Sequence, residues 1–550
     1  MKTISLKSFF LVALSLVLLA ACKQDTIDLQ QKKADQPTTP KNGNVNFSKY
    51  VSIGNSLTAG YQAGALFTEG QNNSFPLILS QQFSLAQGTT ITFNQPDINS
   101  LNGFNSAYSV LPSVVLGRLV LFAADGIQAH AVPTPAGAPG VPAPYNSAGP
   151  DPTKPAFMYT GDTTKLNNFG VPGIILVQGL TPDTGNPAKT AFNPYYYRFA
   201  SKPGVSTIIG DAIRKQPTFF TFDLGNNDVL GYATTGGDGS VPITDQGSFA
   251  TYYQSSIGLL MAKTSASGVV ATIPYVTDIP FFLTIKYNQI PLDDATATQL
   301  MSPAGFGGYN QVLGGLSATL TANPAAFGLS SAQAAPIIAQ IATRYVNYAA
   351  GPSNSMLIKD ETLIDLGPFF DGLLGAGAIT QPQRDGLTPY QQVRQTTSDD
   401  LIPLTAGGIL GTLVGGNPLL VNGVSVPLAD KYVLIPSEQS AIKDAIDGFN
   451  TTIKSTAAAF SARVAVADVN AAFTTFTTHK TITADGVIIT PNFTPPFGAF
   501  SEDGVHPNSR GYAYMANIFI DAINNKTEFG AFVPAASLAD HSGVGLPLVP

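Results

Sequence analysis

The sequence predicts an α/β fold in which a parallel sheet carries helices on both faces, a three-layer α/β/α architecture with large insertions. Short apolar runs that end at glycine or proline alternate with amphipathic, helix-periodic segments, which is the pattern of parallel βαβ units. The composition agrees with a folded core, because 44% of the residues are hydrophobic and only 11% are charged.

Four segments have the character of buried strands. Two of them stop at a glycine and a third stops at a proline, residues that commonly end strands. The fourth follows a predicted helix directly. These segments are Lys49–Ile53, Thr218–Leu224, Gly268–Ile273 and Arg463–Asp468.

Amphipathic segments lie between and after these strands. Apolar residues recur at helical spacing over residues 249–260 and again from Ser437 to Phe460. A third helix is predicted from Arg510 onward. The alternation of strand and helix therefore continues up to this last predicted helix.

Two long intervals, residues 85–160 and 281–436, lack this alternation and are interpreted as insertions in one domain over residues 45–550. Ala131–Pro150 is dominated by Pro, Gly and Ala, which predicts an extended surface loop or a partly disordered one. Within the second insertion, Ser331–Tyr348 has apolar residues in helical register and predicts a helix.

Residues 1–22 have the form of a bacterial export signal, in which basic residues precede an apolar run too short to span a bilayer. Leu19 to Cys22 resembles a lipobox, where the signal is cleaved before a lipidated cysteine. Cys22 is the only cysteine, so an exported chain has no internal disulfide. An ordinary secretory signal is the alternative. The polar residues 23–44 are predicted to be a solvated tether.

These features predict a lipid-anchored protein of the bacterial cell envelope, attached to a membrane through Cys22. The outer membrane or the cell surface is favoured over the inner membrane. The net charge of -7 and the absence of basic runs longer than Lys32–Lys33 argue against a nucleic-acid partner.

Acyl transfer requires a nucleophile, a base, a group that orients the base and donors for an oxyanion. Four segments supply such groups in chain order. In the first, Ser56 stands where a predicted strand ends at Gly54 and a helix begins. Such a residue lies at the carboxyl edge of an open α/β sheet, where ligands bind. A serine that merely caps a helix is the competing interpretation.

The second and third segments offer donors for an oxyanion. Asn168–Gly173 contains closely spaced glycines, which let backbone amides approach a ligand. Gly225–Asp228 directly follows a predicted strand and places the side-chain amide of Asn227 at the same sheet edge. Each segment is also compatible with an ordinary loop or turn.

The fourth segment carries the sharpest signal. Asp503 precedes His506 by three residues in a short loop before a predicted helix. A carboxylate at that spacing can hold the imidazole in place and leave the other ring nitrogen free to face a serine. The chain has only four histidines, so one in this setting is a strong candidate for a base.

Together the four segments resemble the GDSL, or SGNH, hydrolase family, whose conserved stretches occur in this order. The resemblance implies that Ser56 is the nucleophile, His506 the base and Asp503 the residue that orients it. It also implies an oxyanion hole formed by the Ser56 N–H, the Gly173 N–H and the side-chain amide of Asn227. No metal or organic cofactor is implied.

The chain departs from the family pattern at Asn55, where the family has an aspartate before the serine. That aspartate is mainly structural, so activity remains compatible with asparagine. The expected substrate is an ester: an acetylated glycan, a short acyl ester or a lipid.

Other classes of protein fit the sequence less well. An α/β-hydrolase needs a serine flanked by glycines two residues to either side, which the chain lacks. A metalloesterase is disfavoured by the small number of histidines. A non-catalytic surface lipoprotein that binds glycans or another ligand on the same scaffold stays open as the alternative, because tyrosine-rich loops would serve it.

Overall fold

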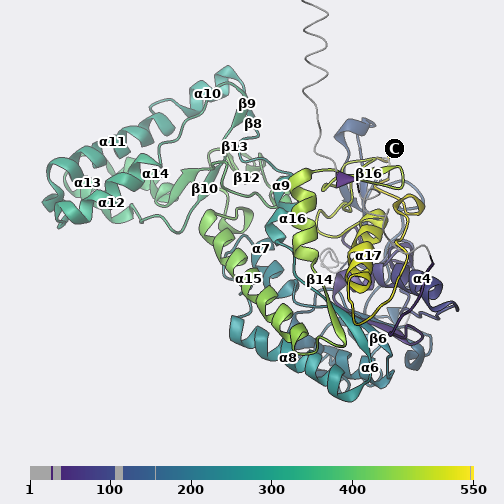
Figure 1. Ribbon diagram of the computed structural model, residues 1–550. Helices are drawn as coiled ribbons and strands as arrows, with labels where there is room; N and C mark the ends of the chain where they lie inside the picture. Colours follow the sequence, from purple (N-terminus) through teal and green to yellow (C-terminus); the bar gives the residue numbers. More distant parts are fainter. Residues whose placement is uncertain (1–26, 29–38, 106–114, 155–156, 546) are drawn as a thin grey trace, which may run out of the picture. The chain divides into compact units, whose positions relative to one another are not determined.

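Figure 1 shows the computed structural model of the chain, which describes residues 27–28, 39–105, 115–154, 157–545 and 547–550. The predicted export signal, Cys22 and most of the predicted tether lie outside the described residues. Within the described ranges, no helix combines the length and the apolar character needed to cross a membrane.

The chain divides into two compact units. The first contains the residues up to Leu224 together with Thr251–Pro274 and Asn450–Pro550. The second contains Gly225–Ala250 and Tyr275–Phe449. The second predicted insertion, residues 281–436, falls inside the second unit.

The first unit is built on a five-stranded sheet in which every neighbouring pair of strands is parallel. The strand order is β14-β7-β6-β2-β5. The strands are β2 (Tyr50–Gly54), β5 (Asn168–Gly170), β6 (Phe219–Asp223), β7 (Ser267–Ala271) and β14 (Val464–Ala467). The chain runs outward from β2 to β5 and then returns to β6 on the other side of β2. In such a sheet the crevice at the reversal, beyond the carboxyl ends of β2 and β6, is the usual ligand site.

Helices cover both faces of this sheet. On one face, α4 (Phe75–Gln87) and α17 (Ser509–Asn524) pack on Tyr50 and Phe219 in one buried apolar cluster. Side chains alternate between the two faces of a strand, so Phe222 points to the face opposite Phe219. There it meets Tyr253 of α8 (Gln246–Lys263), with ring centroids 5.5 Å apart.

The remaining helices and strands of the first unit are short. They are β1 (Ile27–Asp28), α2 (Ser56–Ala59), α3 (Thr68–Asn72), β3 (Leu119–Phe122), β4 (Val132–Pro135), α5 (Pro194–Tyr197), α6 (Ile208–Arg214), α16 (Val469–His479), β15 (Ile482–Ala484) and β16 (Val487–Ile489). The α15 helix (Pro436–Ala458) belongs to the second unit up to Phe449 and to the first from Asn450.

The predicted α/β fold is confirmed at the level of a mixed α/β architecture with a five-stranded parallel sheet flanked by helices. All four predicted strands are present as β2, β6, β7 and β14, and the predicted helices are present as α8, α15 and α17. The strand β5 is absent from the predicted strands, because its three residues contain Asn168, end at Gly170 and have no recognisable apolar pattern. It pairs with β2 at the sheet edge.

The second unit has its own apolar core and is mainly helical. Its elements are α7 (Asn227–Thr234), α9 (Pro280–Leu283), β8 (Ile290–Leu292), α10 (Asp294–Leu300), α11 (Phe306–Ala322), α12 (Ser331–Ala342), β9 (Gly351–Asn354), β10 (Leu357–Lys359), α13 (Gly367–Gly375), α14 (Gln381–Gly386), β11 (Val393–Gln395), β12 (Leu413–Val414) and β13 (Asn417–Val421). Leu313, Leu316 and Phe370 lie fully buried at the centre of the core.

Two expectations for the insertions need correction. The helix predicted over Ser331–Tyr348 ends at Ala342, because the buried Arg344 leaves the helical path and donates hydrogen bonds to the carbonyl oxygens of Gln391 and Ile364. The stretch Ala131–Pro150 is not a continuous loop, since Val132–Pro135 forms β4 and pairs antiparallel with β3.

Candidate active site

Ser56 is the first residue of α2, directly beyond the carboxyl end of β2 (Tyr50–Gly54). The turn before it is tight, because a Cβ at Gly54 would lie 2.0 Å from Thr58 Oγ1 and 2.7 Å from the Asp223 carbonyl oxygen. Asn55 caps α2, and its Oδ1 accepts a hydrogen bond of 2.9 Å from the Leu57 N–H. That bond needs only a side-chain oxygen, which asparagine and aspartate both have.

Ser56, His506 and Asp503 form one chain of hydrogen bonds. Ser56 Oγ lies 2.9 Å from His506 Nε2, and His506 Nδ1 lies 2.8 Å from Asp503 Oδ2. A carboxylate only accepts hydrogen bonds, so Nδ1 carries the proton of the neutral ring. Nε2 is therefore the acceptor that faces the serine hydroxyl. The structure thus brings together the three residues that the sequence analysis proposed, across 450 positions of sequence.

The carboxylate of Asp503 is fully satisfied by local donors. Oδ1 accepts from the N–H groups of Val505 and His506, each at 2.8 Å, and Oδ2 also accepts from the Gly64 N–H at 2.7 Å. Burial acts to raise the pKa of Asp503, but the attraction of a protonated His506 and these hydrogen bonds outweigh it and hold the pKa below its usual value. Asp503 therefore stays ionised and keeps the His506 ring oriented.

Ser501 makes a second contact between residues 63–64 and the loop that carries Asp503 and His506, the histidine loop. Its Oγ accepts a hydrogen bond of 2.8 Å from the Ala63 N–H and lies 2.9 Å from the His506 carbonyl oxygen, to which it donates. Ala63 has a φ of +48°, a conformation that costs a residue with a Cβ and persists where contacts hold it. Ser501 and Asp503 thus lock the histidine loop to residues 63–64.

Tyr61 completes the wall beside the imidazole. Its ring centroid lies 4.8 Å from that of His506, and its carbonyl oxygen accepts a hydrogen bond of 2.6 Å from the buried Tyr512 hydroxyl on α17. The Tyr61 hydroxyl donates to the Gly64 carbonyl oxygen. The ring of Tyr61 packs against the imidazole of His506, and the hydrogen bond from Tyr512 on α17 holds the backbone of Tyr61 in place.

Gly173 presents a backbone amide at the same sheet edge as Ser56. The Val171 N–H donates to the Gly54 carbonyl oxygen at 3.0 Å, which ties the segment after β5 (Asn168–Gly170) to the end of β2. Gly173 has a φ of +77°, and the space where a Cβ would stand is open. The position thus favours glycine and leaves its N–H accessible.

Asn193 orients that amide. Its Nδ2 donates a hydrogen bond of 2.8 Å to the Pro172 carbonyl oxygen. The C=O and N–H of a trans peptide unit point in opposite directions, so fixing the Pro172 carbonyl also fixes the direction of the Gly173 N–H. Asn193 Oδ1 meanwhile caps α5 by accepting from the Tyr195 N–H at 2.9 Å. Among the described residues, neither Ser56 nor Gly173 uses its N–H in a hydrogen bond.

Asn227, the third predicted oxyanion donor, is the first residue of α7, four positions after β6 ends at Asp223. It belongs to the second compact unit, whereas the other predicted site residues described here belong to the first.

Sequence reasoning missed Tyr61, Ala63, Asn193 and Ser501. Ser501 stands close to the Asp503 motif, so a hydroxyl beside that loop was a signal that could have been followed. Tyr61, Ala63 and Asn193 had no such signal in the sequence, because their roles depend on contacts between segments distant in the sequence.

No family model matches the sequence, and no curated protein or solved structure shows significant similarity to it. What defines the protein is therefore its own geometry: a mixed α/β fold with a serine, a histidine and an aspartate hydrogen-bonded in series at the carboxyl edge of a parallel sheet.

Proposed function

We propose that the protein is a serine hydrolase that cleaves carboxylic esters through an acyl-enzyme on Ser56. The observation that carries the proposal is the hydrogen-bond chain from Ser56 Oγ through His506 to Asp503. Ser56 is 8% exposed and lies at the edge of the sheet where open α/β folds bind ligands.

In this mechanism Ser56 Oγ attacks the ester carbonyl while His506 Nε2 takes its proton. His506 then gives that proton to the leaving alcohol. His506 Nε2 then takes a proton from a water molecule that attacks the acyl-enzyme, and it returns this proton to Ser56 Oγ as the acid leaves. Asp503 stabilises the imidazolium and holds its orientation.

The developing oxyanion needs preorganised donors. We assign this role to the N–H groups of Ser56 and Gly173, and the participation of the side-chain amide of Asn227 stays a prediction from the sequence. The first sits at the start of α2, and the second is oriented through the Pro172 carbonyl by Asn193.

Two further features support a GDSL, or SGNH, type of hydrolase. The four segments occur in the order of that family, and the strand order corresponds to the 2-1-3-4-5 order of flavodoxin-like sheets. Together with the predicted export signal and the predicted lipidation of Cys22, this favours an ester of the cell envelope or of a nutrient as the substrate.

The test uses the purified protein with p-nitrophenyl acetate and butyrate, and separately with a fluorophosphonate that acylates activated serines. We expect hydrolysis of at least one ester and labelling of the peptide that contains Ser56. Ser56→Ala should lose both, while Ser48→Ala, at an exposed serine, should lose neither. Labelling at another serine, or equal hydrolysis by Ser56→Ala, would refute the assignment.

The alternative is a non-catalytic surface lipoprotein that binds a glycan or another ligand on this scaffold. It predicts that the wild-type protein neither hydrolyses the esters nor reacts with the fluorophosphonate. The complete hydrogen-bond chain at Ser56 favours the enzyme, since ligand binding alone does not need it.

Asn193 tests the positioning of the oxyanion donor. Asn193→Asp keeps the oxygen that caps α5 but loses the donor to the Pro172 carbonyl. We expect kcat to fall by about tenfold to a hundredfold, since losing a whole oxyanion donor costs about 10²–10³. KM should change little. Steady-state kinetics beside a thermal melt separate this effect from loss of fold, and an unchanged kcat would remove Asn193 from the mechanism.

A further inference from the structure

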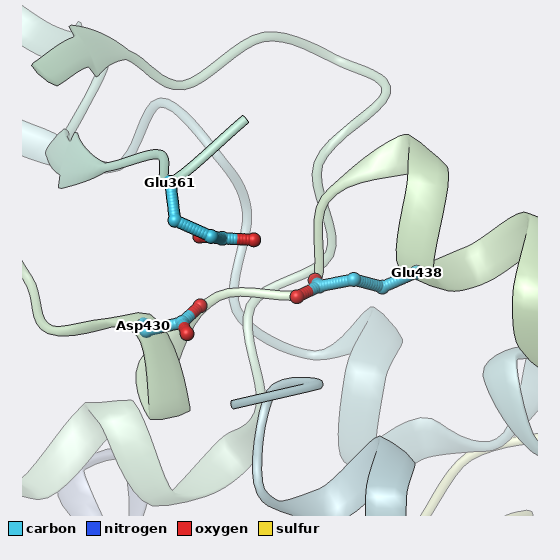
Figure 2. A group of neighbouring side chains, drawn as sticks. All are labelled: Glu361, Asp430 and Glu438. Atoms are coloured by element: carbon cyan, nitrogen blue, oxygen red, sulfur yellow. The ribbon is translucent and has the colours of Figure 1, made fainter. Parts of the chain in front are cut away.

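Three carboxylates gather in the second unit, in a place that the proposed hydrolase mechanism does not use (Figure 2). Glu361 follows β10 (Leu357–Lys359), Asp430 begins a short 3-10 helix over Asp430–Tyr432, and Glu438 stands in the first turn of α15. One oxygen from each residue lies within 4.8 Å of the other two. Figure 2 shows all three carboxylates pointing into the same space.

Glu438 is the unusual member of this group, because its carboxylate is buried and only half satisfied. The residue is 5% exposed. Its Oε2 accepts a hydrogen bond of 2.7 Å from the Ile435 N–H, but Oε1 is buried without a hydrogen-bond partner among the described residues. A buried acceptor left in this state is costly and calls for a partner that the protein itself does not provide.

The backbone around Glu438 holds this oxygen in place. A Cβ at Gly237 would lie 2.4 Å from both Oε1 and Cδ of Glu438, so the Gly237 backbone packs directly against the carboxylate. Gly237 has a φ of +76°, which also disfavours any other residue. The Gly237 backbone therefore limits how far the Glu438 carboxylate can turn away from its place beside Asp430 and Glu361.

The charges of the group are not neutralised by an ion pair. In the described part of the chain, none of the three carboxylates lies within 4.0 Å of a basic side chain, although Lys359 lies close enough to act on Asp430. Carboxylates this close to one another repel unless a proton or a cation lies between them.

We propose that Glu361, Asp430 and Glu438 form a binding site for a hard divalent cation of the Ca²⁺ type. The donor set contains only oxygen, which Ca²⁺ and Mg²⁺ prefer and which softer ions do not. Three ligands from three separate segments suit the flexible, irregular coordination of Ca²⁺ better than the strict octahedron of Mg²⁺. Glu361 is exposed and Asp430 is partly exposed, so the ion and its remaining water ligands have access.

Such an ion would join the end of β10, the Asp430 turn and the start of α15. It would stabilise the second unit by binding its folded state and not the unfolded chain. This role is independent of the proposed catalysis, because none of the three residues belongs to the Ser56 site.

Titration of the metal-free purified protein with CaCl2, followed by calorimetry and by thermal melting, tests the site. We expect one bound ion with a Kd at or below about 10⁻³ M and a rise in melting temperature on adding CaCl2. Glu438→Gln keeps an oxygen for the Ile435 N–H, and Glu361→Gln changes an exposed side chain, so the second variant keeps the fold even if the first does not. Each should weaken binding by at least about tenfold.

Asp385→Asn, which removes an exposed carboxylate on α14, is the control and should bind Ca²⁺ as the wild type does. Absence of calcium binding by the wild type would overturn the proposal. It would mean that protons, and not a cation, relieve the repulsion between the carboxylates. Wild-type affinity in Glu361→Gln would overturn it equally.

Discussion

Asp503→Asn is expected to lower kcat/KM by about four orders of magnitude, the size of effect known for loss of the orienting aspartate in serine proteases. Among substitutions that leave Ser56 and His506 in place, we expect this to be the largest loss of activity. The reason lies in the four hydrogen bonds that the carboxylate accepts.

Oδ1 of Asp503 faces the N–H groups of Val505 and His506, and Oδ2 faces the Gly64 N–H and the His506 ring. An asparagine can present its single oxygen to only one of these pairs. If the oxygen stays with Val505 and His506, the NH2 group meets the Gly64 N–H and His506 Nδ1. Nδ1 then becomes the acceptor, Nε2 carries the proton, and the ring no longer accepts the proton of Ser56.

Steady-state hydrolysis of p-nitrophenyl butyrate measures this loss. Glu502→Gln, at the neighbouring carboxyl, is the control, because Glu502 makes no hydrogen bond to His506 among the described residues. A loss of less than about tenfold in Asp503→Asn would show that Asp503 does not orient the base.

Among the substitutions considered, Asp223→Asn is expected to change the free energy of unfolding most. We expect it to remove the pH dependence that Asp223 gives to this free energy. Asp223 ends β6, is 3% exposed, and its Oδ2 is buried without a hydrogen-bond partner among the described residues. Burial raises the pKa of this carboxyl to about 7, from 3.8 for an exposed aspartate. The folded protein therefore holds a proton that the unfolded chain has already released.

Because the pKa of Asp223 is higher in the folded protein than in the unfolded chain, its protonation stabilises the fold. This stabilisation is fully present at pH values below the pKa of the unfolded chain, and it is lost as the pH rises to the pKa of the folded protein. For Asp223 this window runs from about pH 4 to about pH 7. Each unit of pKa difference corresponds to about 1.4 kcal/mol, so the free energy of unfolding should fall by about 4 kcal/mol across the window. The amide introduced by Asp223→Asn is neutral at every pH in this window. The free energy of unfolding of the variant should therefore not show this fall.

Thermal melts of both proteins at about pH 4 and about pH 7 measure the difference. Near pH 4 the two side chains are both neutral in the folded protein and of the same shape, so their comparison isolates the cost of the amide. Asp399→Asn, at an exposed carboxylate, should follow the wild type. A parallel pH dependence in wild type and Asp223→Asn would show that folding does not raise the pKa of Asp223.

Much of the sheet was predictable, because β2, β6, β7 and β14 are apolar runs with clear ends, and the helices α8, α15 and α17 carry periodic apolar faces. These signals are local. β5 was missed since its three residues, from Asn168 to Gly170, acquire strand geometry only by pairing with β2. The end of α12 was misplaced because the hydrogen bonds of the buried Arg344 reach residues 20 and 47 positions away.

By itself the sequence identified Ser56, Asp503 and His506 as candidates and the alternation of strand and helix that predicts a parallel sheet. Only the tertiary structure decided that Ser56 Oγ lies 2.9 Å from His506 Nε2, and that Ala63 and Gly64 hold the histidine loop. It also decided that Glu361, Asp430 and Glu438 meet. The physical reason is the range of the interactions: strand and helix patterns repeat within a few residues, whereas these contacts form between segments that come together only when the chain folds.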